Sequence, residues 1–175
     1  MNEDIERMYI DNSDAVYRFI YLLIRHKETA EDLTQETFYK AVKSMNKFNY
    51  RSSVLTWLLK IARNVTYDHL RRKKVIQFLS LGTKNECDIE KQSPVEIAEK
   101  KEDLLRLYNA LERIKKDYRD VLILRKVNER SIKETSYILG WTEAKVKAKM
   151  ARGLEALRKE YDGKEGFIDG SIKGN

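Results

Sequence analysis

The chain has 175 residues, of which 36% are charged, with a formal net charge of +7 and a pI near 9.3. This length allows one or two small domains, and the basic balance favours a polyanionic partner. A single cysteine excludes an internal disulfide framework, and no apolar run approaches the ~20 residues that a membrane helix needs. Because the N-terminus is acidic and unlike a signal peptide, we expect a soluble cytoplasmic protein without direct membrane insertion.

The first half of the chain carries helical periodicity with few breakers. Apolar residues at helical spacing predict a first helix over about residues 3–26. Thr29 and Asp32 resemble a capping box that begins a second helix, which runs to about Met45. Ser53 is placed to cap a third helix, expected from about Val54 to Lys74 or slightly beyond.

The periodicity breaks down near the middle of the chain and then resumes. We predict a first domain over residues 1–76, a flexible linker over 77–95, a second domain over 96–160 and a flexible tail over 161–175. Helical spacing runs from Val95 to Ile114, and Val121–Val127 predicts another short helix. The pattern is typical of an all-α protein with two small helical domains.

A helix-turn-helix is predicted near the C-terminus. Ser131 with Glu134 forms a capping box for its first helix, and Gly140 stands where a left-handed conformation ends that helix. Thr142 is placed to cap the second helix. A helix pair of this kind presents its second helix to a DNA major groove.

The second helix of this motif sorts into distinct faces at ~100° per residue. The residues expected to pack inward are Val146, Met150, Gly153 and Leu157, and those expected on the opposite face are Ala144, Ala148 and Ala151. Flanking these alanines are Lys145, Lys147, Lys149 and Arg152. Small central residues let the backbone approach the floor of the groove, while the basic residues on either side reach phosphates. Arg152 is alternatively placed to contact the edge of a guanine base. The competing interpretation is an amphipathic helix with a solvated basic face.

The third helix has a basic and aromatic outer face. Between residues 60 and 74 there are six basic residues and one acid, Asp68. The inward residues are Val54, Trp57, Leu58, Ile61, Ala62 and Val65, and the outward ones are Lys60, Arg63, Asn64, Tyr67, Arg71 and Lys74. Phe48 and Tyr50 precede the helix in a polar loop. Basic groups beside aromatic rings suit unpaired bases, although each aromatic residue is also a candidate for local packing.

The second helix begins with an acidic turn. Leu33, Thr37, Ala41 and Met45 are expected inward, and Asp32, Glu36, Tyr39 and Lys43 outward. Exposed acids in a basic protein favour a protein partner of complementary charge. The alternative is a purely local role, since acids favour a helix start and Glu36 can pair with Lys40.

These three segments, in this order, resemble bacterial RNA polymerase sigma factors. Residues 30–41 resemble the polymerase-binding segment, and residues 50–64 with 68–73 resemble the promoter-melting and −10 recognition helix. Leu111–Arg158 resembles the −35-reading domain. The short linker leaves no room for the middle domain of primary sigma factors, so the chain resembles the extracytoplasmic-function (ECF) group.

The resemblance implies partners and a role for each matching residue. The residues implied to contact the clamp coiled coil of the largest polymerase subunit are Asp32, Gln35, Glu36 and Tyr39, while the flap would hold the C-terminal domain. The residues implied for −10 DNA are Phe48, Tyr50, Lys60, Arg63, Asn64, Tyr67 and Arg71, with the choice between Phe48 and Tyr50 at the flipped base left open. The residues implied for −35 DNA are Lys145, Lys147, Ala148, Lys149 and Arg152. Promoter DNA and an anti-sigma factor are the remaining implied partners.

Ser136, Ala148 and the pair Met150-Ala151 depart from the usual family pattern, so the −35 preference cannot be copied from a relative. We expect no catalytic residue, metal, cofactor or small-molecule substrate, because two histidines and one cysteine offer little from which to build an active site. The alternative function is a conventional helix-turn-helix regulator that acts without replacing sigma.

Overall fold

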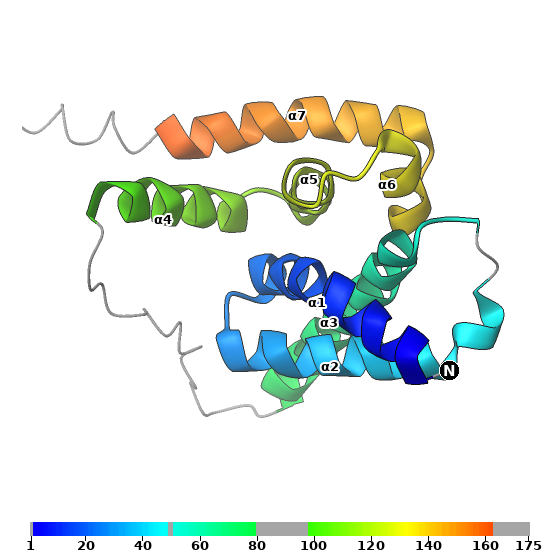
Figure 1. The fold of residues 1–175 in the computed structure, drawn as a ribbon. Helices are drawn as coiled ribbons and strands as arrows, with labels where there is room; N and C mark the ends of the chain where they lie inside the picture. Colours follow the sequence, from blue (N-terminus) through cyan, green and yellow to red (C-terminus); the bar gives the residue numbers. More distant parts are fainter. Residues whose placement is uncertain (1, 49–50, 80–97, 163–175) are drawn as a thin grey trace, which may run out of the picture. The chain divides into compact units, whose positions relative to one another are not determined.

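The computed structural model describes residues 2–48, 51–79 and 98–162, and the elements there are all helical (Figure 1). They are α1 (Asn2–Ile24), α2 (Lys27–Lys43), the 3-10 helix η1 (Met45–Lys47), α3 (Val54–Leu79), α4 (Ala98–Arg113), α5 (Lys116–Leu122), the π-helix η2 (Ile123–Val127), α6 (Ile132–Leu139) and α7 (Glu143–Asp162). Within those ranges no helix combines the length and apolar character needed to span a bilayer. The predicted all-α fold is confirmed.

The chain forms two compact units, as predicted. Helices α1, α2 and α3 belong to the first unit and α4, α5, η2 and α7 to the second, and the division falls within α6. Helix α3 extends to Leu79, three residues beyond the predicted end of the first domain at residue 76. The boundaries themselves stay predictions, since residues 80–97 and 163–175, which include most of the predicted linker (77–95) and tail (161–175), lie outside the described residues.

The first unit is a bundle in which α1, α2 and α3 each pack against the other two. Its largest fully buried apolar side chains come from α1 and α3: Val16, Phe19, Ile20, Leu58, Leu59 and Val65. The inward face predicted for α2 is confirmed at Leu33, Thr37 and Ala41, which are buried. Thr37 satisfies its buried hydroxyl by donating to the Leu33 carbonyl oxygen at 2.7 Å, so a polar residue is tolerated in the core.

The start of α2 differs from the prediction. The cap is His26, whose Nδ1 accepts a hydrogen bond from the Thr29 amide at 3.2 Å. Thr29 therefore lies inside the first turn, and its hydroxyl also contacts His26 Nδ1 at 2.9 Å. The preceding Arg25 has φ +59°, a left-handed conformation that reverses the chain between α1 and α2. The capping box at Thr29 and Asp32 was wrong because a histidine ring supplies the acceptor three residues earlier.

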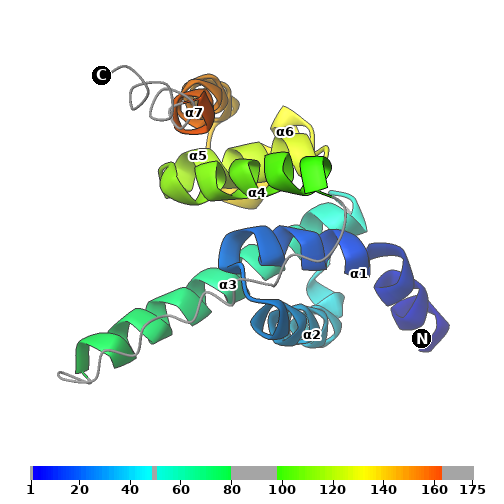
Figure 2. The ribbon, with the colours of Figure 1, turned by 90° about the vertical axis from the view of Figure 1, so that its left-hand side faces the viewer.

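Helix α3 is the longest helix described, and its C-terminal part projects beyond α1 and α2 (Figure 2). The basic residues Arg71 to Lys74 are exposed there, as are Val75 and Ile76. The bundle therefore buries the first half of α3 and leaves the second half available to a partner.

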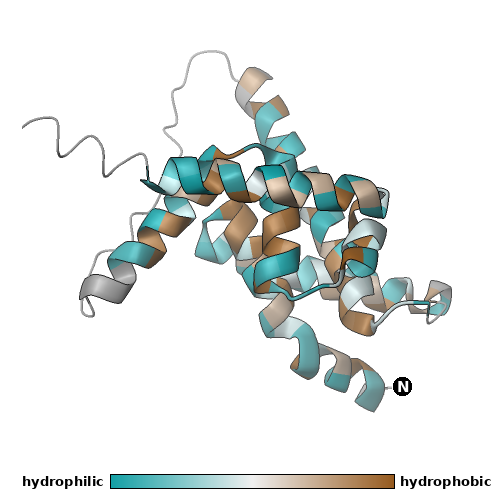
Figure 3. Cartoon of the chain, turned by 90° about the horizontal axis from the view of Figure 1, so that it is seen from above, coloured by the Kyte–Doolittle hydropathy of each residue, from teal (hydrophilic) through white to brown (hydrophobic). Residues whose placement is uncertain are grey.

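The second unit surrounds a cluster of Leu111, Ile114 and Leu122, against which Tyr118 and Leu157 also pack. Helices α5 and α7 make the most extensive helix contact in this unit. Hydrophobic and hydrophilic residues alternate around its helices, as burial of one face requires (Figure 3). The helix predicted over Val121–Val127 begins five residues earlier, at Lys116, and its second part is the π-helix η2.

Candidate nucleic-acid interface

The outer face of α3 brings together most of the residues predicted for −10 DNA. Asn64 and Arg71 are exposed, while Lys60, Arg63 and Tyr67 are half-buried. The Arg63 guanidinium carbon lies 5.0 Å from the Tyr67 ring centroid, and Arg71 pairs with Asp68 at 3.1 Å. These contacts join residues three or four positions apart, so α3 alone presents a row of cations beside an aromatic ring.

The aromatic residues before α3 have different places. The Phe48 ring lies against the Trp57 ring, with centroids 4.8 Å apart and a 31° angle between the planes. This contact fits the local packing role weighed above for Phe48. Tyr50 lies outside the described residues, so the choice between Phe48 and Tyr50 stays open. Ser53 caps α3 as predicted, because its hydroxyl accepts from the Thr56 amide at 3.2 Å.

Sequence reasoning missed an open hollow beside this face. It is lined by Lys40 of α2 and by Asp68, Arg71 and Arg72 of α3. The neighbouring His69 has a lowered pKa because of burial first, and then because of the cations Lys73 and Arg72, while Glu36 opposes the shift. Lys40 could not be assigned to this surface from its own helix, since only the packing of α2 on α3 brings it there.

The acidic start of α2 is accessible to a partner. Asp32 and Gln35 are exposed, and the Tyr39 side chain is 59% exposed. Glu36 pairs with Lys40 at 2.8 Å, which confirms the local pairing considered for it. Lys43 lies 4.3 Å from the centroid of the Tyr39 ring. The outer face of α2 therefore presents an exposed anion, Asp32, and an exposed aromatic ring, Tyr39.

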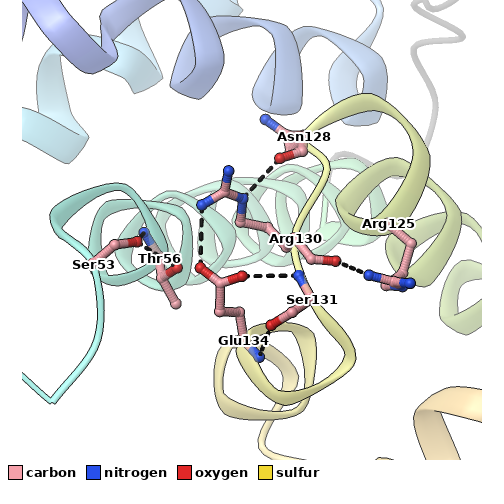
Figure 4. Close-up of polar contacts among 7 residues, drawn as sticks. All are labelled: Ser53, Thr56, Arg125, Asn128, Arg130, Ser131 and Glu134. Atoms are coloured by element: carbon pink, nitrogen blue, oxygen red, sulfur yellow. Dashed lines mark hydrogen bonds and ion pairs between the residues drawn. The ribbon is translucent and has the colours of Figure 1, made fainter.

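The start of the helix-turn-helix is tied down by the predicted capping box and by two arginines (Figure 4). The Ser131 amide donates to Glu134 Oε2 at 2.8 Å, and the Glu134 amide donates to Ser131 Oγ at 3.1 Å. Arg130 donates to the Asn128 carbonyl at 2.7 Å and to Glu134 Oε1 at 3.2 Å, and Arg125 donates to the Arg130 carbonyl. The connection from η2 to α6 is thus held by side chains on both sides of the turn.

The turn between the two helices also follows the prediction. Gly140 has φ +66°, a backbone conformation that L side chains rarely adopt. The Trp141 amide donates to the Ser136 carbonyl at 3.1 Å, and Ser136 Oγ donates to the Trp141 carbonyl. Ser136 therefore has a structural reason to replace the small apolar residue usual at its position. Thr142 caps α7 by accepting from the Lys145 amide at 3.2 Å.

Helix α7 presents the predicted faces. Val146 and Gly153 are buried, and the exposed small residues are Ala144, Ala148 and Ala151. A Cβ on Gly153 would meet the Tyr118 Cβ at 3.2 Å, so glycine allows α5 to approach α7 closely. Sequence reasoning placed Gly153 inward but could not supply this reason, because Tyr118 is distant in the chain.

The four predicted cations of α7 differ in whether they have a partner within the chain. Lys147 and Arg152 are exposed. Lys145 lies 4.2 Å from the Trp141 ring centroid, and Lys149 pairs with Asp117 of α5 at 2.8 Å. The Lys149 hydrogen bond is the main reason why the pKa of Asp117 lies below its usual value. Two of the four predicted cations therefore already have partners within the protein.

Comparison with known proteins agrees with this arrangement. The sigma-70 region 2 model matches residues 8–75, and the sigma-70 region 4 model matches residues 104–157. The ECF RNA polymerase sigma factor SigX of Bacillus subtilis is 36% identical over 93% of this chain and 86% of its own length. SigM of the same organism is 31% identical over 91% of this chain and 94% of its own length.

The fold matches a solved structure as well. The sigma factor RpoE of Bartonella quintana, solved with the anti-sigma factor NepR, superposes with a TM-score of 0.77 at 24% identity, over 90% of this chain and 96% of that one. Two family models in the expected order and relatives of similar length leave one assignment. The chain belongs to the ECF group of sigma-70 factors, the initiation factors that bind core RNA polymerase and direct transcription from specific promoters.

Proposed function

We propose a division of labour in which α2 binds core RNA polymerase, α3 holds the melted −10 strand and α7 binds the −35 duplex. The observation that carries it is the presence of two unlike basic faces on separate units of one sigma factor. The α3 face combines Arg63 and Arg71 with the Tyr67 ring, which suits unstacked bases. The α7 face has an alanine centre between exposed Lys147 and Arg152, which suits a groove with phosphates on either side.

For core binding, we assign Asp32, Gln35, Glu36 and Tyr39 to the clamp coiled coil of the largest subunit. The exposure of Asp32 and Tyr39 supports this assignment, since a partner can reach both. We assign the second unit to the polymerase flap. Melting requires no covalent chemistry. Unpairing and unstacking cost a few kcal/mol per base, and binding of the unstacked bases to the protein compensates for this cost.

We further propose that an anti-sigma factor controls this protein in the cytoplasm. The structural neighbour RpoE was solved with such a partner, and the exposed surfaces of α2 and α3 are where a competitor of polymerase would bind. Co-purification of the tagged chain from its native host, followed by identification of a stoichiometric partner other than polymerase, tests this part.

The central experiment is transcription with purified components. Mapping transcript starts after overexpression identifies candidate promoters, and the purified chain is then added to core RNA polymerase on those templates. We expect initiation only when chain and core are both present, and weak DNA binding by the chain alone. Tight, specific duplex binding without polymerase, together with no initiation at any mapped promoter, would instead identify a conventional helix-turn-helix regulator.

A further inference from the structure

The ion pair between Asp117 and Lys149 joins a helix outside the helix-turn-helix to the recognition helix. Lys149 Nζ donates to Asp117 Oδ2 at 2.8 Å across 32 positions of sequence. The Lys149 ammonium also lies 5.4 Å from the centroid of the Tyr118 ring. Its side chain is only 25% exposed, so Lys149 is held between a carboxylate and an aromatic ring.

The close approach of α5 and α7 creates this pair. Gly153 follows Lys149 by one helical turn, and it lets Tyr118 and Leu122 pack directly on the α7 backbone. Asp117 is the residue before Tyr118, and its carboxylate is therefore brought beneath Lys149. Lys145 and Lys116 are also close enough to lower the pKa of Asp117 further, so the carboxylate remains charged at neutral pH.

The other two cations of α7 provide the contrast. Lys147 and Arg152 are exposed, and neither is paired with another residue in the described part of the chain. Each can bind a phosphate at the cost only of its hydration and mobility. Lys149 would also have to break a charged hydrogen bond, and Asp117 would be left without its partner beside the negative DNA.

We propose that Asp117 is a positioning residue that competes with DNA phosphate for Lys149 and so limits the affinity of α7 for duplex DNA. The inference rests on the proposed role of α7 at the −35 element and adds a residue outside that helix. A lysine that binds phosphate releases condensed counterions, and each such contact steepens the fall of log K with log salt by about 0.9. At about 0.15 M salt, one extra contact corresponds to roughly fivefold in affinity.

The test measures the salt dependence with which the full chain binds a short fluorescent duplex of unrelated sequence. Asp117→Asn frees Lys149, so we expect a slope steeper by about 0.9 and roughly fivefold tighter binding near 0.15 M salt. Asp117→Glu keeps the carboxylate, so its slope should stay as shallow as that of the unchanged chain. In the otherwise unchanged chain, Lys149→Ala should alter the slope little, whereas Lys147→Ala should make it shallower by about 0.9.

Two controls separate competition from a simple change in net charge. Glu102→Gln removes a carboxylate that pairs with Arg106 at 2.9 Å on α4, and it should reproduce only the general gain from a lost negative charge. In a double variant that also carries Lys149→Ala, Asp117→Asn should raise the affinity for DNA by no more than that general gain. An equal effect of Asp117→Asn with and without Lys149, or no effect at all, would overturn the proposal.

The comparison of the two lysines does not depend on the fold of the Asp117 variants. If Lys149→Ala flattens the slope as much as Lys147→Ala does, Asp117 does not withhold Lys149 and the proposal is overturned. If neither Lys147→Ala nor Arg152→Ala changes binding, the assignment of α7 to DNA fails instead, which is a distinct result.

Discussion

The basic faces of α3 and α7 differ in what holds their side chains. On α3, two contacts stay within the helix: Arg63 lies over Tyr67, and Arg71 pairs with Asp68. On α7, Lys149 is held by Asp117 from another helix, and the backbone is fixed against α5 at Gly153. Arg63 and Arg71 are thus held by residues of their own helix, whereas Lys149 is held by a residue of another helix.

This difference fits the two kinds of DNA proposed for the two faces. Unpaired bases have no fixed geometry, so locally held aromatic and basic side chains can adapt to them. A duplex presents phosphates at fixed positions on either side of a groove, and a rigidly placed helix meets them best. Similar charge on two helices therefore does not imply a similar mode of binding. The roles proposed for α3 and for α7 can each be tested.

The largest effect should come from weakening the contact proposed between α2 and polymerase. Asp32 is exposed at the head of α2, so Asp32→Lys should leave the fold intact while reversing the charge offered to the clamp. We expect binding to immobilised core RNA polymerase to fall by roughly a hundredfold or more. Asp11→Lys, the same change at an exposed site on α1, is the control. Unchanged retention of Asp32→Lys on core would refute the clamp assignment.

The second prediction concerns the close contact between α5 and α7 at Gly153. Gly153→Val places a branched side chain where even a Cβ meets Tyr118 at 3.2 Å, so α5 must shift away. We expect the free energy of unfolding, measured by urea denaturation, to fall by about 2–3 kcal/mol. Ala151→Val on the exposed face should cost less than about 1 kcal/mol. Equal losses in the two variants would show that α5 and α7 are not closely fixed.

A third prediction separates the two DNA modes directly. On a duplex promoter, Arg152→Ala and Tyr67→Ala should each lower initiation roughly tenfold, through lost groove contacts and lost base stacking respectively. On the same promoter with a premelted −10 region, output from Tyr67→Ala should recover, because the strand is already open. Output from Arg152→Ala should stay low. Recovery of both variants, or of neither, would contradict the division between α3 and α7.

The smallest expected effect concerns pH and the Asp117–Lys149 pair. The folded-state pKa of Asp117 is depressed, chiefly by the Lys149 hydrogen bond. The contribution of the Asp117 carboxylate to the free energy of unfolding is therefore present above its unfolded-state pKa. That contribution is lost as pH falls through the lower folded-state pKa. Because both side chains are partly exposed, we expect less than about 1 kcal/mol. Urea denaturation at neutral and acid pH, for the unchanged chain and for Asp117→Asn, measures the difference. A pair that stabilises equally at both pH values would contradict this linkage.

Local patterns made most of the helix-turn-helix predictable. The Ser131–Glu134 box, the Gly140 turn and the Thr142 cap each involve residues within a few positions of one another, and all three are confirmed. Faces also followed from spacing, as Leu33 and Val146 show. Such features depend on backbone geometry that the sequence nearby determines.

What the sequence could not predict depends on packing between distant segments. The partner of Lys149 lies 32 positions away, and Lys40 reaches the hollow beside Arg72 only because α2 packs on α3. The His26 cap was missed because a histidine acceptor is outside the usual set of capping residues. The residue roles at the polymerase and DNA surfaces stay predictions, since they depend on partners rather than on this chain.

The π-helix η2 has a consequence for insertions and deletions in this chain. The Asn128 amide donates to the Ile123 carbonyl at 3.0 Å, five residues back, so this turn contains one residue more than an α-helical turn. Removing one residue within α7 would rotate the rest of the helix by about 100° and split the alanine face between two sides. Removing one codon within η2 can be absorbed by tightening the turn to α-helical geometry. A one-residue deletion in η2 should therefore disturb the proposed DNA-binding face of α7 less than the same deletion within α7.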